Sequence, residues 1–176
     1  MKIKKLYSLV LTVIIFVSCQ STDSIQVNNS NAEFNIPSFI KSEILRLEKL
    51  NPTITKSVSN NKTEETQKVK ISNWNNEFAQ FLNFDINKIG SSNFTKETKN
   101  DSVTFISNVN NKEDVKIQLI YAQGKLIELD IHRKSKNLLF SNEEHLNYTL
   151  DKHYLISKNQ KVKGLGDNEY IIKGVF

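Results

Sequence analysis

The segment VKIQLIYAQGKLIELDI, residues 115–131, decides the fold that the sequence predicts. Its first half alternates apolar and polar residues, residues 122–125 turn the chain around Gly124, and the alternation resumes at Ile127. A period of two on both sides of a short turn is typical of a β-hairpin. On the return strand this period places three polar side chains together on one face: Glu128, Asp130 and His132.

The same period of two recurs on both sides of this hairpin. Short turns separate the successive strands, and such strands must pair antiparallel because parallel pairs need long crossovers. We therefore expect further strands around residues 103–105, 146–150, 154–162 and 169–176, a loop over 164–168, and a separate hairpin over 53–71 with its turn at Asn60-Asn61.

Residues 35–50 predict an amphipathic helix, because their apolar side chains recur at steps of three and four. Asn35 is suited to cap it, Pro37 is tolerated in the first turn, and Asn51-Pro52 ends it. Such a stripe either covers a sheet or lies on a membrane surface. The opposite face carries both acids and bases, whereas membrane-surface helices favour Lys and Arg, so the sheet is favoured.

Residues 73–87 predict a second helix with an aromatic face that includes Phe78 and Phe81. Trp74 is expected to anchor this helix against the sheet. Together these patterns predict an α+β fold: a curved antiparallel sheet of about seven to nine strands, with the two helices of the N-terminal half packed on one face.

Composition narrows the classes of partner. The chain has 24 Lys and Arg against 19 Asp and Glu, but Lys2, Lys4 and Lys5 lie at the extreme N-terminus. Without these three, 21 basic residues face 19 acidic ones, a net charge of +2. The remaining lysines are interspersed with acids, so we expect no nucleic-acid partner.

The N-terminus, MKIKKLYSLVLTVIIFVSC, has the layout of a secretory signal: lysines, an apolar run over residues 9–17, and a small residue before Cys19. The motif Phe16-Val17-Ser18-Cys19 resembles the lipobox of bacterial lipoproteins, with Phe16 where leucine is usual. This resemblance implies cleavage before Cys19 and acylation of its sulfur. The alternative is an ordinary signal peptide followed by an unpaired cysteine, and a lone thiol is unusual in an oxidising compartment.

The predicted division is a signal peptide over residues 1–18, an acylated cysteine and polar linker over 19–33, and a single domain over 34–176. The residue after Cys19 is Gln20. In the lipoproteins that this motif resembles, an aspartate there favours retention in the inner membrane. Its absence indicates the outer membrane, with the lipid anchor as the chain's contact with the bilayer.

The alternating strand residues Glu128, Asp130 and His132 are the only set that suggests a metal site. Any half-exposed strand produces the same alternation, so the favoured interpretation is a solvated face; a metal would need a further ligand from a neighbouring strand. His145 and His153 lie near no nucleophile motif. We therefore predict no enzyme activity, no metal and no cofactor.

Beyond the lipobox, the motifs NPTITKSV at residues 51–58 and FDINK at 84–88 resemble a group of small uncharacterised bacterial lipoproteins. The resemblance implies no activity. Two hypotheses remain: a non-catalytic interaction or structural module that presents a sheet face or the 53–71 hairpin to an envelope protein, and an acyl-chain carrier. The carrier would have an apolar groove between sheet and helices, a layout similar to that of envelope proteins that ferry lipoproteins. Four apolar residues could line the far side of its sheet: Ile106, Ile120, Leu138 and Phe140.

Overall fold

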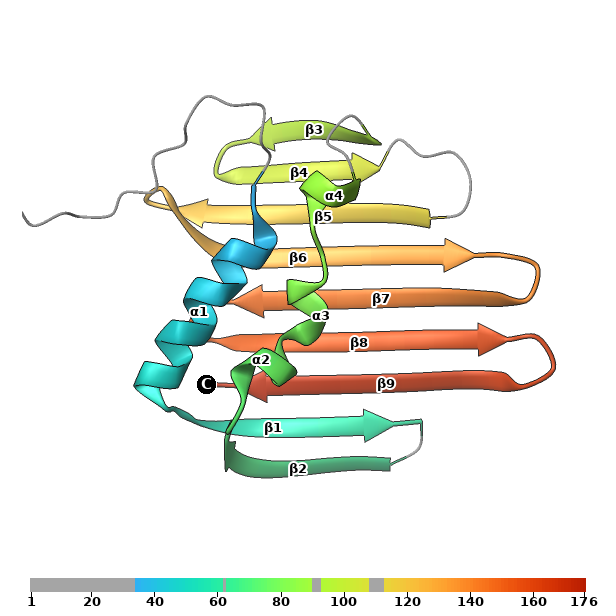
Figure 1. Cartoon of the computed structure of the whole chain (residues 1–176), viewed down its shortest axis with the longest axis horizontal. Coiled ribbons are helices and arrows are strands. Elements are labelled where there is room, and N and C mark those ends of the chain that lie inside the picture. The colour runs from blue at the N-terminus through green and yellow to red at the C-terminus, as the bar shows by residue number, and fades with distance from the viewer. Residues whose placement is uncertain (1–33, 62, 90–92, 108–112) are drawn as a thin grey trace, which may run out of the picture. The chain divides into compact units, whose positions relative to one another are not determined.

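The computed structural model describes residues 34–61, 63–89, 93–107 and 113–176, and these form one antiparallel sheet with short helices against it (Figure 1). The strand order is β2-β1-β9-β8-β7-β6-β5-β4-β3. The prediction of an antiparallel sheet of seven to nine strands is confirmed. The strands are β1 (Thr53–Asn60), β2 (Thr63–Lys70), β3 (Phe94–Lys99), β4 (Ser102–Ser107), β5 (Glu113–Ala122), β6 (Lys125–Lys136), β7 (Phe140–Thr149), β8 (His153–Val162) and β9 (Gly166–Val175).

Strands β3 to β9 follow one another across the sheet, and the first hairpin joins at the far side. β1 pairs with β9, from Thr55 opposite Val175 to Asn60 opposite Tyr170. The hairpin predicted over residues 53–71 is therefore present, and its second strand β2 forms one edge of the sheet. The last strand begins at Gly166, so the loop before it is shorter than predicted.

The central β5–β6 hairpin turns at Gln123 and Gly124, which both have positive φ, 51° and 75°. Two positive φ values are typical of the tight turns that match the twist of paired strands. The pairing then shifts, because Tyr121 lies opposite Leu126 and Ile127 is an extra residue in β6. Leu126 is buried where the sequence pattern had placed Ile127, so that detail of the prediction was wrong.

Helix α1 (Ile36–Leu50) begins and ends as predicted. The Asn35 side chain accepts a hydrogen bond of 2.9 Å from the Ser38 amide, and Asn51 closes the helix with a positive φ of 47°. Four residues of the predicted stripe are buried in the core with sheet residues: Ile36, Ile40, Ile44 and Leu47.

The predicted second helix over residues 73–87 is wrong in its continuity. The chain forms three single turns: α2 (Trp74–Glu77), α3 (Ala79–Leu82) and α4 (Ile86–Ile89). Phe78 leaves helical geometry between the first two, and the Asp85 carboxylate accepts from the Asn87 amide before the third. Asn and Asp side chains that bond nearby backbone groups compete with a continuous helix.

These turns still bury the aromatic face, and the prediction that Trp74 is an anchor is confirmed. The Trp74 ring stacks on Phe176 at 6.0 Å and meets the edge of Tyr154 at 6.2 Å. Tyr154 lies over Gly174 of the neighbouring strand, where a Cβ atom would come within 2.0 Å of the ring. The aromatic side chains therefore fill the space between the short helices and the sheet.

Candidate functional site

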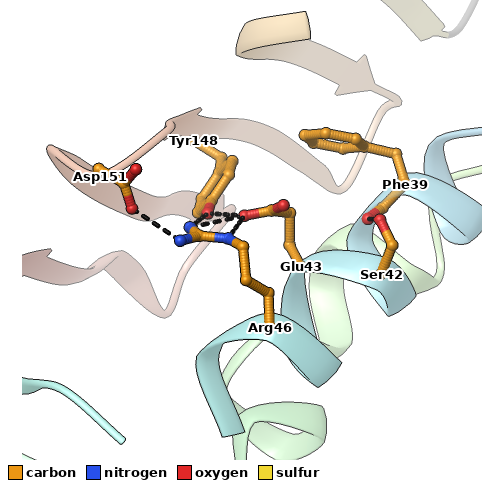
Figure 2. Close-up of polar contacts among 6 residues, drawn as sticks. All are labelled: Phe39, Ser42, Glu43, Arg46, Tyr148 and Asp151. Atoms are coloured by element: carbon orange, nitrogen blue, oxygen red, sulfur yellow. Dashed lines mark hydrogen bonds and ion pairs between the residues drawn. The ribbon is translucent and has the colours of Figure 1, made fainter. Parts of the chain in front are cut away.

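The first polar cluster on the helix-covered face joins α1 to β7 (Figure 2). The buried Tyr148 hydroxyl donates to Glu43 at 2.5 Å, and the Arg46 Nε group donates to the same carboxylate at 2.9 Å. Arg46 also donates to Asp151 at 2.8 Å, as Figure 2 shows. Burial raises the pKa of Tyr148 well above its usual value, and the bond to Glu43 raises it further. The hydroxyl therefore stays protonated, and its hydrogen bond to Glu43 links β7 to α1.

A second cluster repeats this chemistry under α2. The Tyr154 hydroxyl donates to one oxygen of Glu77 at 2.6 Å, and Lys56 of β1 bonds the other oxygen at 2.7 Å. Burial, followed by the bond to Glu77, raises the pKa of Tyr154. In each cluster a carboxylate binds both a tyrosine hydroxyl and a cation. The groups come from α1 and β7 in the first cluster and from α2, β8 and β1 in the second, so both clusters link a helix to the sheet.

The opposite face of the sheet has a different character. The helices drawn in Figure 1 all lie on one side of it, so within the described ranges no helix covers this second face, here called the open face. Alternate positions of β5 to β9 supply its side chains, most of which are polar: Lys116, Gln118, Asp130, His132, His145, Asn147, Ser157, Asn159 and Lys173.

At the centre of the open face two histidines share one carboxylate. His132 of β6 and His145 of β7 are directly paired, and their rings stack with centroids 3.9 Å apart. Nε2 of His132 lies 2.9 Å from one oxygen of Asp130, and Nε2 of His145 lies 2.8 Å from the other. Asn147 donates to Asp130 at 2.8 Å and to Glu128 at 3.1 Å.

This arrangement differs from the sequence prediction in two residues. Asp130 and His132 lie together as predicted, but Glu128 bonds Asn147 instead of joining the histidines. The residue of the neighbouring strand that joins Asp130 is His145, which sequence analysis had not connected with the other two. The pairing register of β6 and β7 places His145 opposite His132. Alternation within a single strand does not define which residues of the next strand lie opposite. His153 lies opposite Thr149 and outside this cluster.

An exposed apolar tip occurs where two hairpins end side by side. The loops after β6 and β8 lie at the same end of the sheet in Figure 1, and the Lys163 amide donates to the Leu139 carbonyl at 2.9 Å. Sequence analysis had suggested, within the acyl-carrier hypothesis, that Leu138 and Phe140 could line the far side of the sheet, and it did not connect them with the other two members. The apolar tip consists of Leu138, Leu139, Leu165 and Phe140, which are 94%, 70%, 87% and 37% exposed.

The tip loop is held in place by its own hydrogen bonds. The Asn137 side chain accepts from the amides of Leu139 and Phe140, both at 2.8 Å. Lys161 beside it is paired with Asp167 at 2.9 Å. The leucines are thus presented on an ordered loop.

The hollows in the described surface are open, and polar and apolar side chains line them together. One of about 410 Å³ near the same end is lined by charged and amide groups, among them Asp114, Lys134, Glu143 and Asn159. Among the residues that the structure describes, aromatic rings fill the space between the short helices and the sheet, where the acyl-carrier hypothesis expected a groove.

Three further findings concern the whole chain. Cys19, the predicted lipidation site, lies outside the described residues. In the described part of the chain, the helices are too short to cross a bilayer. Comparison with protein-family models, with curated proteins and with solved structures gave no match.

Proposed function

We propose that this protein is a lipid-anchored component of the bacterial envelope that works as a non-catalytic interaction module, and that its apolar tip binds an envelope protein. The proposal combines two parts. The anchor rests on the lipobox-like motif ending at Cys19, and the interaction rests on the exposed side chains of the tip.

The exposed tip is the observation that carries the proposal. Single apolar residues on a surface are normal, but a contiguous group is typical of an interaction site. Here three leucines from two adjacent loops lie with Phe140, the first residue of β7, and a backbone hydrogen bond connects the two loops. Binding would bury these side chains with little ordering cost, because Asn137 already fixes the loop.

The polar chemistry elsewhere supports a module without catalysis. Glu43 and Glu77 each bond a tyrosine hydroxyl and a cation, so their charges are already compensated. The polar open face likewise weakens the acyl-carrier alternative, since a carrier needs a continuous apolar lining. The interaction module is therefore favoured over the carrier.

The anchor is tested by metabolic labelling with a clickable fatty acid in the bacterium that makes the protein. The parent chain is expected to take up the label and to fractionate with the outer membrane. Cys19→Ser is expected to lose the label. Labelling that survives Cys19→Ser would contradict the anchor assignment.

The interaction is tested by placing a photo-crosslinking amino acid at Leu138 or Leu165 of the full chain in the same cells. Leu45 of α1, which is 68% exposed and far from the tip in sequence, provides a matched control. Crosslinks to one envelope protein from both tip positions, and none from Leu45, are expected. Adducts with lipid alone would assign the tip to the membrane surface instead, and equal crosslinking from all three positions would contradict a specific site.

A further inference from the structure

We propose that Asp130, His132 and His145 on the open face form a binding site for a divalent transition-metal ion of the zinc class. The inference is independent of the proposed function, because it rests on a different part of the sheet. Two imidazole nitrogens and a carboxylate oxygen are the donor set that zinc-type ions prefer, whereas magnesium and calcium prefer oxygen alone.

The donor atoms already converge. One ligand atom from each of the three residues lies within 4.8 Å of the other two. Zinc binds nitrogen and oxygen at about 2.0–2.2 Å, so ligands at the corners of a tetrahedron lie roughly 3.3 Å apart. The present nitrogen-to-oxygen distances of 2.8 and 2.9 Å would therefore lengthen by about half an ångström as the ion enters between them.

The two histidines can free a nitrogen lone pair for the ion by moving one proton each. A carboxylate only accepts hydrogen bonds, so each Nε2 that bonds Asp130 carries its proton in the metal-free protein. On metal binding that proton moves through solvent to Nδ1 of the same ring, and the freed Nε2 lone pair bonds the ion. The stacked rings, now 17° apart, tilt so that both lone pairs point at one ion.

The surroundings hold the carboxylate and leave the site open. Asn147, itself buried, donates to Asp130 and orients it, as partners behind metal ligands commonly do. The three ligands lie on two paired strands, which position side chains more firmly than loops do. The side chains of His132 and His145 are 43% and 31% exposed, so an ion can reach them and water can complete its coordination.

Around the site the carboxylates outnumber the lysines. Glu128 and Glu143 lie on the strands that carry the ligands, and Lys116 lies opposite His132. Lys134 is paired with Glu143 at 2.9 Å, which leaves that lysine compensated. Asp130 and Glu128 therefore outweigh Lys116, and the site favours a cation.

The test uses the full-length chain carrying Cys19→Ser, so that no free thiol competes for metal. Zinc binding is measured by isothermal titration calorimetry with zinc chloride, and the bound metal is counted after dialysis. One ion per chain is expected. His132→Ala and His145→Ala should each weaken binding by roughly tenfold or more, whereas His153→Ala, which removes a histidine outside the cluster, should leave it unchanged.

Nitrogen NMR of the imidazoles provides a readout that does not depend on affinity. Zinc should shift the Nε2 signals of His132 and His145 and leave those of His153 in place. Circular dichroism in EDTA verifies that each variant is folded. Absence of zinc binding by the parent, or equal loss in His153→Ala, would overturn the proposal.

Discussion

The covered and open faces of the sheet use the same bond, an acid that accepts from ring side chains, in two different surroundings. Strand β7 contributes to both: Tyr148 bonds Glu43 beneath α1, and His145 bonds Asp130 on the other side. Tyr148 is buried, whereas almost a third of the His145 side chain is exposed. Burial therefore decides whether such a bond holds two elements together or remains within reach of a ligand.

The largest effect on stability is expected at Gly174 on the covered face, where the Tyr154 ring occupies the space that a side chain would need. Gly174→Val puts side-chain atoms into the space of the Tyr154 ring, within 2.0 Å for the Cβ alone. The Tyr154 ring cannot move away, because Trp74 and Phe78 pack against it. The free energy of unfolding should fall by about 3 kcal/mol or more. Urea denaturation measures it. Lys173→Ala, one position away on the open face, is the control and should stay within about 0.5 kcal/mol of the parent.

Removal of an acid that is largely shielded from solvent should have the next largest effect on stability. Glu77→Ala leaves Lys56 and the Tyr154 hydroxyl without their partner beneath α2. The expected loss is about 2–3 kcal/mol, since unpaired buried polar groups are costly. Asp130→Ala on the open face should cost less than about 1 kcal/mol in the same urea experiment. Equal losses would remove the distinction between the two faces.

Alkaline pH should weaken the covered face in particular. The pKa values of Tyr148 and Tyr154 are raised above the ordinary value of 10.0, so the folded state favours their protonated forms. That stabilisation is complete below about pH 10 and is lost as the pH rises further, by about 1.4 kcal/mol per pH unit for each tyrosine. Urea unfolding between pH 9 and 12 measures the slope.

Tyr154→Phe is the matched variant for this slope, because it keeps the ring and removes the titrating hydroxyl. Its stability should fall less steeply with pH than that of the parent. Parallel slopes for the two proteins would show that the hydroxyl ionises in the folded state as readily as in the unfolded chain.

The smallest effect on stability is expected at the apolar tip. Leu138→Ser combined with Leu165→Ser replaces two side chains that are almost fully exposed. The free energy of unfolding should change by less than about 0.5 kcal/mol, while crosslinking from position 139 to the envelope partner should disappear. A large loss of stability would mean that the tip is part of the fold and not a contact surface.

The sequence predicts the strands well because their signal is local. Alternation over β5 and β6 and the turn at Gly124 lie within one short segment, and α1 carries both of its caps in the sequence. Continuity of the second helix was not predictable from spacing, because Phe78 and Asp85 interrupt it while the same aromatic side chains remain buried.

The candidate site could not be predicted from local sequence patterns, because it depends on which strands and loops meet. The meeting of Asp130 with His145 depends on the register between β6 and β7, and the tip depends on two hairpins that end together. Helix and strand periods assign a side chain to a face, but they do not determine its cross-strand neighbour. Pairing between strands, once known, identifies both features.

The most direct test compares two substitutions on the single strand β7, each assayed for stability and for zinc binding. Tyr148→Phe should lower the free energy of unfolding by about 1–2 kcal/mol and leave zinc binding intact. His145→Ala should leave stability within about 1 kcal/mol and weaken zinc binding by roughly tenfold or more. If either substitution changed both properties to a similar degree, the division between a structural face and a ligand-accessible face would be contradicted.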